Sequence, residues 1–154
     1  HADLREAWLG SRHNHACAMR RCLEILPSKN IFQLGIRSGT REEFYELQKY
    51  KRLISHSVGQ AANDLTKRLT PHLGKPIYLT VDLDWFDPSV MPGTGTPEPG
   101  GFFWQDFALV IDVLKEHKVI AADVVELAPK LDPTEISSLL AAKVTRSLIM
   151  LLSK

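Results

Sequence analysis

The sequence alternates between short apolar runs and longer segments in which apolar residues recur at helical spacing. The apolar runs predict three strands, at residues 31–35, 77–81 and 119–125. None of these runs shows a sustained alternation of apolar and polar positions, which favours buried parallel strands. The helical segments cover residues 14–26, 40–50, 59–73, 104–117 and 133 to the carboxyl terminus.

Capping signals support three of these helices. Asn14 is a candidate N-cap, and Thr40 with Glu43 fits a capping box. Asp132 is a further candidate N-cap, with Pro133 at the first helical position. Two segments also have an apolar face that we expect to point inward. The residues are Phe107, Val110, Ile111 and Leu114 in one helix, and Leu139, Leu140, Val144, Leu148 and Leu151 in the last.

Because helices and strands alternate, the sequence predicts an α/β fold with a mostly parallel sheet flanked by helices. We find no internal repeat and no linker, so we expect a single domain over residues 1–154. In open parallel sheets, ligands bind beyond the carboxyl ends of the strands. The polar residues that follow each predicted strand are therefore the first place to search for chemistry.

Composition and charge exclude several functions. Of the 154 residues, 44% are hydrophobic and 24% are charged, which is typical of a globular protein. The formal net charge is +1, so neither nucleic acid nor a membrane surface is expected as a partner. No apolar run has the length of a membrane span. We expect Cys17 and Cys22 to be reduced thiols of a cytoplasmic protein.

The strongest chemical signal is the segment Val81–Pro88, VDLDWFDP, where three acids follow an apolar strand. Asp82 and Asp84 point to one face of an extended strand and could bind one cation, which would offset the cost of placing carboxylates together. Asp87 precedes a proline and is better interpreted as a turn former. The alternative interpretation is that all three acids only cap and turn the strand end.

Four other features carry candidate chemistry, each with an ordinary structural alternative. His1 and Asp3 suit a transition-metal site, or His1 is a solvated terminal residue. His15 is a candidate acid or base, or a surface histidine at a helix start. Glu126 follows the third strand and could bind a guanidinium, or form a loop salt bridge. The Gly- and Pro-rich segment 91–101 could approach a ligand closely, or be a structured loop.

In this order, the pieces resemble the ureohydrolase superfamily of arginases, agmatinases and formiminoglutamases. His1-Ala2-Asp3 resembles the end of the DAHxD metal motif, and VDLDWFDP resembles the second metal motif. The loop PGTGTP with the following GG, and the segment from Glu126 through Pro129 to Asp132, match two further motifs. The stretches Gly35–Gly39 and His15–Arg21 are most similar to the agmatinase branch.

The resemblance implies an arginase-like three-layer αβα sandwich and a site with two Mn²⁺ ions, for which Ni²⁺ is an alternative. By position, His1, Asp3, Asp82 and Asp84 would bind metal. A hydroxide bridging the two ions would attack the guanidinium carbon. Asp3 would also orient this hydroxide, Glu126 would hold the guanidinium, Thr94 would lie in the substrate loop and His15 would protonate the leaving amine.

The implied reaction converts agmatine to putrescine and urea, which would place the enzyme in polyamine biosynthesis. Guanidinobutyrate, arginine and guanidine are alternative substrates, and Trp85 and Phe86 either narrow the substrate pocket or pack in the core. The motif residues that would precede His1 are not in the sequence. We therefore expect the chain to be the carboxyl-terminal portion of one ureohydrolase domain that lacks its amino-terminal strands.

The resemblance implies one further property, and two alternatives to it stay open. Relatives are multimers, so we expect a homo-oligomer that acts on a small guanidino substrate. A truncated, inactive interaction or oligomerisation domain is the alternative to an enzyme. A copper site formed by the amine and imidazole of His1 with His13 or His15 is an alternative use of the terminal histidine.

Overall fold

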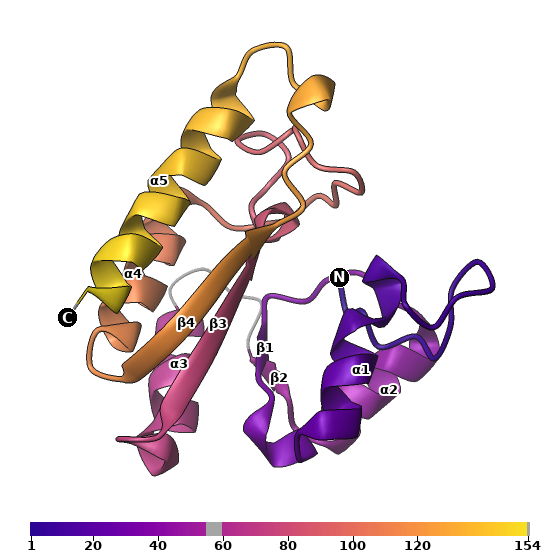
Figure 1. The fold of residues 1–154 in the computed structure, drawn as a ribbon, viewed down its shortest axis with the longest axis vertical. Coiled ribbons are helices and arrows are strands. Elements are labelled where there is room, and N and C mark those ends of the chain that lie inside the picture. The colour runs from indigo at the N-terminus through magenta and orange to yellow at the C-terminus, as the bar shows by residue number, and fades with distance from the viewer. Residues whose placement is uncertain (55–59, 154) are drawn as a thin grey trace. The chain divides into compact units, whose positions relative to one another are not determined.

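Two parallel strand pairs organise the chain. The structure is a computed structural model that describes residues 1–54 and 60–153. The described residues fall into two compact units, one within His1–His56 and one within Ser57–Lys154. Each unit contains one two-stranded parallel sheet with its own helices (Figure 1). Parallel pairing with intervening helices confirms the predicted α/β class.

The first unit is built around a short sheet and two helices. The 3₁₀ turn His15–Cys17 leads into α1 (Ala18–Ile25), and a second 3₁₀ turn (Ser28–Asn30) precedes β1 (Gln33–Leu34). Helix α2 (Arg41–Lys49) connects β1 to its parallel partner β2 (Leu53–Ile54). The core of this unit contains the buried Ala2, Leu4 and Leu47, with Met19, Leu23, Ile36 and Phe44 packed against them.

The second unit contains the longer sheet. Helix α3 (Ala61–Leu69) and a 3₁₀ turn (Thr70–His72) precede β3 (Pro76–Asp82), which ends in the 3₁₀ turn Leu83–Trp85. Helix α4 (Trp104–Leu114) then leads to β4 (Lys118–Val125), the 3₁₀ turn Pro129–Leu131 and α5 (Ile136–Leu152). Strand β3 pairs with β4 in parallel, with Asp82 opposite Val125. Helix α5 packs against β4, and α3 packs against α4.

Most of the local predictions are confirmed. The side chain of Asn14 caps the turn at His15, and Thr40 and Glu43 form both hydrogen bonds of a capping box at the start of α2. The predicted apolar face of α4 is buried at Phe107, Val110, Ile111 and Leu114. None of the helices in the described ranges is both long and apolar enough to cross a membrane.

Two local predictions about the last helix are wrong. Helix α5 begins at Ile136 and not at Pro133, because Glu135 has a left-handed backbone (φ 62°) that interrupts the helix start. Asp132 still serves this helix, since its carboxylate accepts a hydrogen bond from the backbone N–H of Ser137 at 2.8 Å. Leu139 points outward and is 68% exposed.

The strand predictions also needed correction. The sequence does not predict strand β2. The strand is only two residues long, too short to give an apolar pattern of its own. The strands of the second unit are parallel but not buried throughout, since Tyr78 and Thr80 are exposed and donate hydrogen bonds to Asp123 on β4, at 2.5 and 2.6 Å. Residue 59, the expected start of α3, lies outside the described residues.

Candidate functional site

The end of β3 brings two carboxylates together. Asp82 is the last residue of the strand, and its Oδ1 accepts a hydrogen bond from the backbone N–H of Asp84 at 3.0 Å. This bond turns the chain out of the strand and into the 3₁₀ turn that carries Asp84, whose side chain is buried. The hydroxyl of Thr96 lies 3.5 Å from Asp84 Oδ2. Thr96 belongs to the predicted loop, and no sequence signal distinguishes it from Thr94.

Glu126 reaches the same edge from the neighbouring strand. Because Asp82 lies opposite Val125, the last residue of β4, the chain reaches Glu126 beside the carboxylates. The backbone of Glu126 is left-handed, with φ 71°, a conformation that non-glycine residues adopt mostly where the surroundings impose it. A Cβ placed on Gly95 would lie 3.9 Å from Glu126 Oε2, so the glycine loop passes close to this carboxylate.

The acids at this edge influence one another. Burial is the largest cause that raises the pKa of Asp82 to about 7, followed by the charge of Asp84, and the charge of Glu126 acts in the same direction. A carboxyl group in these surroundings is costly to ionise unless a cation is close. The edge of the second unit therefore has the electrostatics of a cation site.

The donor set fits a hard divalent cation in chemistry, because carboxylate oxygens suit Mn²⁺. Asp82 at the end of β3 and Asp84 in the 3₁₀ turn that follows are two such donors. Within residues 1–54 and 60–153, no group of three or more His, Cys, Asp or Glu side chains is arranged to hold a metal ion. The second unit thus provides part of a ligand set.

The loop that follows is anchored at Gly93. The backbone N–H of Gly93 donates to Ser137 Oγ on α5, and its carbonyl accepts from Ala128 N, both at 2.8 Å. A Cβ on Gly93 would lie only 2.8 Å from Ser137, so no larger residue fits here. Thr94 is buried, and its hydroxyl has no hydrogen-bond partner among the described residues.

Asp87 confirms its predicted role as a turn former. Its Oδ1 accepts hydrogen bonds from the backbone and hydroxyl of Ser89, and its Oδ2 accepts from the backbone N–H groups of Gly100 and Gly101 at 3.0 Å. The hydroxyl and amide of Ser89 are the main causes that lower the pKa of Asp87. This carboxylate ties the two ends of the glycine-rich loop together.

The two aromatic residues beside the acids pack into the core. Phe86 is 1% exposed, and the Trp85 ring stacks on Phe102 with centroids 4.4 Å apart and contacts Phe107 edge-on. Of the two interpretations of these residues, the structure supports core packing.

His1, Asp3 and His15 lie in the first unit. Ala2, between the first two, is buried, and its N–H donates to the carbonyl of Ser38 at 3.0 Å. Asp3 has a left-handed backbone with φ 53°. His15 is exposed at the first position of its 3₁₀ turn. The remaining candidates, Asp82, Asp84, Thr94 and Glu126, lie in the second unit.

Neither cysteine forms a disulfide in the structure. Cys17 is buried, and its thiol lies 3.9 Å from the carbonyl oxygen of Ser11. Cys22 is half-buried on α1.

Comparison with known proteins gives consistent matches. The agmatinase of Halalkalibacterium halodurans is 35% identical over 153 residues, which is 97% of this chain and 52% of that protein. The N(1)-aminopropylagmatine ureohydrolase of Thermococcus kodakarensis is 40% identical over 141 residues, covering 90% and 48% of the two chains. A crystal structure from Clostridium difficile superposes with a TM-score of 0.90 at 39% identity, covering 99% of this chain and 55% of that one.

These matches confirm the arginase-like fold. The chain spans about half the length of the curated relatives it matches. The model of the arginase family matches residues 1–151, nearly the whole sequence and all the motifs described above. This protein chain therefore belongs to the arginase family.

Proposed function

We propose that this chain is part of a metal-dependent ureohydrolase that converts agmatine and water to putrescine and urea. The observation that carries the proposal is the convergence of Asp82, Asp84 and Glu126 at one edge of the β3–β4 sheet, in a chain of the arginase family. An acidic edge of this kind suits both a divalent cation and a cationic guanidinium.

In this proposal, Asp82 and Asp84 hold Mn²⁺, with Ni²⁺ as the alternative, and His1 and Asp3 add the ligands that the family resemblance assigns to them. A pair of such ions supplies a strong water-derived nucleophile at neutral pH. The raised pKa of Asp82 supports the assignment, since a cation would stabilise its ionised form and remove the cost of burying it.

Glu126 recognises the substrate. A carboxylate can accept two parallel hydrogen bonds from a planar guanidinium, which fixes both its position and its orientation. The left-handed backbone of Glu126 and the adjacent Gly95 direct this side chain toward the glycine loop. Thr94, whose buried hydroxyl has no partner among the described residues, contributes a free hydrogen-bonding group to this loop.

His15 supplies the proton. The bond between the guanidinium carbon and the alkyl nitrogen breaks when that nitrogen takes up a proton and leaves as an amine. An exposed imidazole at the start of a 3₁₀ turn can exchange this proton with solvent. Water provides the oxygen of urea, so the reaction balances as agmatine plus water to putrescine plus urea.

Several guanidino compounds are candidate substrates. The similarity to agmatinases favours agmatine, and the similarity to the N(1)-aminopropylagmatine ureohydrolase of Thermococcus kodakarensis adds N(1)-aminopropylagmatine as a second candidate. Guanidinobutyrate, arginine and guanidine differ at the end of the molecule away from the guanidinium. Homo-oligomer formation and a cytoplasmic location stay predictions.

The test is urea release by the protein encoded in the complete reading frame, loaded with Mn²⁺ or Ni²⁺ and given each of the five compounds. We expect agmatine to have the highest kcat/KM. Glu126→Gln should raise KM for agmatine at least ~10-fold, because one of two charge-assisted bonds is lost. Glu116→Gln removes the same charge at an exposed position of the same unit and should change nothing.

Two results would contradict the proposal. One is an absence of urea from all five compounds with either metal. The other is an equal effect of the Glu126 and Glu116 substitutions, which would mean that Glu126 does not contact the guanidinium.

A further inference from the structure

We infer that Glu43, the capping residue of α2, is a positioning residue for the metal ligand Asp3, assisted by Arg20 and Gln33. This inference rests on the proposed function, because it assumes that Asp3 binds metal. It concerns three residues to which no chemical role was assigned above.

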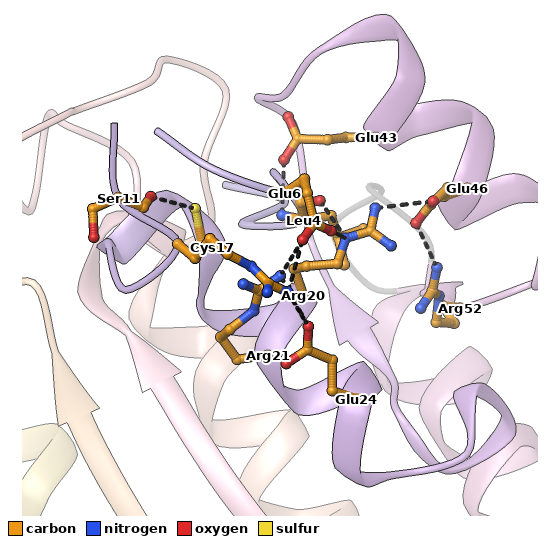
Figure 2. A network of polar contacts seen from close by, with 11 residues as sticks. Leu4, Glu6, Ser11, Cys17, Arg20, Arg21, Glu24, Glu43, Glu46 and Arg52 are labelled. Carbon is orange, nitrogen blue, oxygen red and sulfur yellow. Dashed lines mark hydrogen bonds and ion pairs between the residues drawn. The ribbon is translucent and has the colours of Figure 1, made fainter. Parts of the chain in front are cut away.

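Glu43 connects α2 to the ligand segment. Its Oε1 accepts a hydrogen bond from the backbone N–H of Leu4 at 2.8 Å, across 39 residues of sequence (Figure 2). Its Oε2 accepts from the N–H of Thr40 at 2.7 Å as part of the capping box. Both oxygens of this buried carboxylate therefore bind backbone amides, and one of the two amides immediately follows Asp3.

Arg20 holds the same segment from α1. Its Nε donates to the carbonyl of Leu4 at 2.9 Å, and its backbone N–H donates to the carbonyl of Asp3 at 3.1 Å. The other end of its guanidinium pairs with Glu46 on α2 at 2.9 Å (Figure 2). Because the backbone N–H of Arg20 and both sides of its guanidinium have partners, the hydrogen bond from Nε to Leu4 has a defined direction.

Gln33 completes the set from β1. Its Nε2 donates to the carbonyl of Ala2 at 2.8 Å, while the N–H of Ala2 donates to Ser38. Gln33 is itself buried, so this bond is made away from solvent. A Cβ on Gly39 would lie 3.1 Å from Ala2 Cβ and 3.4 Å from Glu43 Oε2, so the glycine leaves room for the segment to reach its partners.

The result is a segment with its backbone held on both sides of Asp3. Ala2 and Leu4 are each 1% exposed, so their side chains anchor it in the core, while His1 and Asp3 are only half-buried. Asp3 adopts its left-handed backbone between these two anchors. Residues that orient a metal ligand commonly affect metal affinity 10- to 100-fold, a range known for groups that hydrogen-bond to ligands.

The experiment measures Mn²⁺ affinity and the Mn²⁺ EPR spectrum of the protein from the complete reading frame. We expect Glu43→Ala to lower the affinity ~10- to 100-fold and to change the spectrum. Glu43→Gln keeps one acceptor oxygen for Leu4 N, so it should retain more of the affinity than Glu43→Ala. If Glu43→Ala does not fold, Arg20→Lys makes the same test, because it keeps the charge and loses the fixed Nε donor.

Two control variants separate positioning from helix stability. Thr40→Ala removes the hydroxyl that caps α2 and leaves the Leu4 bond in place, so it should lower Tm but keep the Mn²⁺ affinity. Glu42→Ala removes an exposed charge from the same turn and should change neither.

The outcomes also distinguish the two proposals. If the parent protein binds no Mn²⁺ and releases no urea, the proposed function fails. If the parent binds Mn²⁺ and Glu43→Ala binds it equally well, or loses no more affinity than Thr40→Ala, the inference about Glu43 is overturned.

Discussion

The segments His1–Leu4 and Asp82–Asp84 both carry two candidate ligands spaced two residues apart, but they are held in different ways. Asp82 ends a seven-residue strand that is paired along its length, and a local hydrogen bond fixes the turn to Asp84. The His1–Leu4 segment belongs to no helix or strand and depends on Gln33, Glu43 and Arg20, which lie 16 to 39 residues away. The same spacing of ligands is thus supported by local pairing in one unit and by distant side chains in the other.

The difference predicts where each segment is vulnerable. The acids at the end of β3 should tolerate changes in distant side chains and respond to changes in the adjoining turn. The segment around Asp3 should respond to substitutions far from it in the sequence. Four predictions test this contrast.

Of the substitutions considered, Gly101→Ala should cause the largest loss of stability, and this loss falls on the second unit. A Cβ at this position would lie 2.5 Å from the backbone carbon of Phe86 and closer still to Asp87 N, and backbone cannot move aside cheaply. We expect a loss of about 3 kcal/mol in the free energy of unfolding, measured by urea denaturation. At Gly74, where φ is +75° but nothing lies within 4 Å, alanine should cost only about 1 kcal/mol. Equal losses at both positions would show that the turn after β3 is not closely packed.

Gln33→Leu should weaken the first unit. The substitution keeps the side-chain size but leaves the Ala2 carbonyl without its donor, which costs about 1–2 kcal/mol for a buried group. It should also lower Mn²⁺ affinity, though less than Glu43→Ala does. Gln48→Leu, at an exposed position of α2, is the control and should affect neither. If Gln33→Leu binds Mn²⁺ as tightly as the parent protein, the hydrogen bond from Gln33 is not needed to position the His1–Leu4 segment.

Asp132→Asn should lower Tm by ~3 °C at pH 7, because both carboxylate oxygens accept hydrogen bonds and the amide keeps only one acceptor oxygen. Hydrogen bonds from Thr134 and then Ser137 lower the pKa of Asp132 in the folded protein. A carboxyl group with a lowered pKa stabilises the fold above its ordinary pKa, and this contribution is lost as the pH falls below about 4. The Tm difference between the parent and the variant should therefore shrink in acid, and a constant difference from pH 7 to pH 3 would contradict this account.

Asp82 should show the opposite pH dependence. Its pKa is raised to about 7 in the folded metal-free protein, mainly by burial and then by Asp84, so folding takes up protons between about pH 4 and pH 7. The metal-free protein should lose stability as the pH rises through this window, and Asp82→Asn should remove that loss. The expected shift is ~5 °C or more in Tm between pH 5 and pH 8. If Tm rises with pH in the metal-free parent and not in Asp82→Asn, the pKa of Asp82 is lowered by folding and not raised.

The comparison of Asp82 with Asp132 and Asp87 shows how carboxylates with different roles can be told apart. Asp87 and Asp132 accept hydrogen bonds from backbone amides and hydroxyls, which lowers their pKa and makes them structural anchors. Asp82 lies buried beside another acid, and its pKa is raised. The sequence motif VDLDWFDP contains both kinds, and only their surroundings distinguish them.

The strand–helix alternation, the capping box of α2 and the position of the acids after β3 could all be predicted from the sequence. These features depend on residues close together in the chain, such as Thr40 with Glu43 and the apolar run before Asp82. The order of the motifs was also enough to identify the family. Local propensity and motif order carry this information because neither requires knowledge of a distant partner.

Other features depend on contacts between distant segments and could be read only from the tertiary structure. In the structure, α5 begins at Ile136, Leu139 is exposed and Phe86 packs in the core. It placed the Glu126 carboxylate beside Gly95, and it gave the capping glutamate of α2 a second partner 39 residues away. A carboxylate has more acceptor sites than a helix cap uses, and which amide fills the second one depends on how distant segments pack. That packing made Glu43 a candidate positioning residue for Asp3.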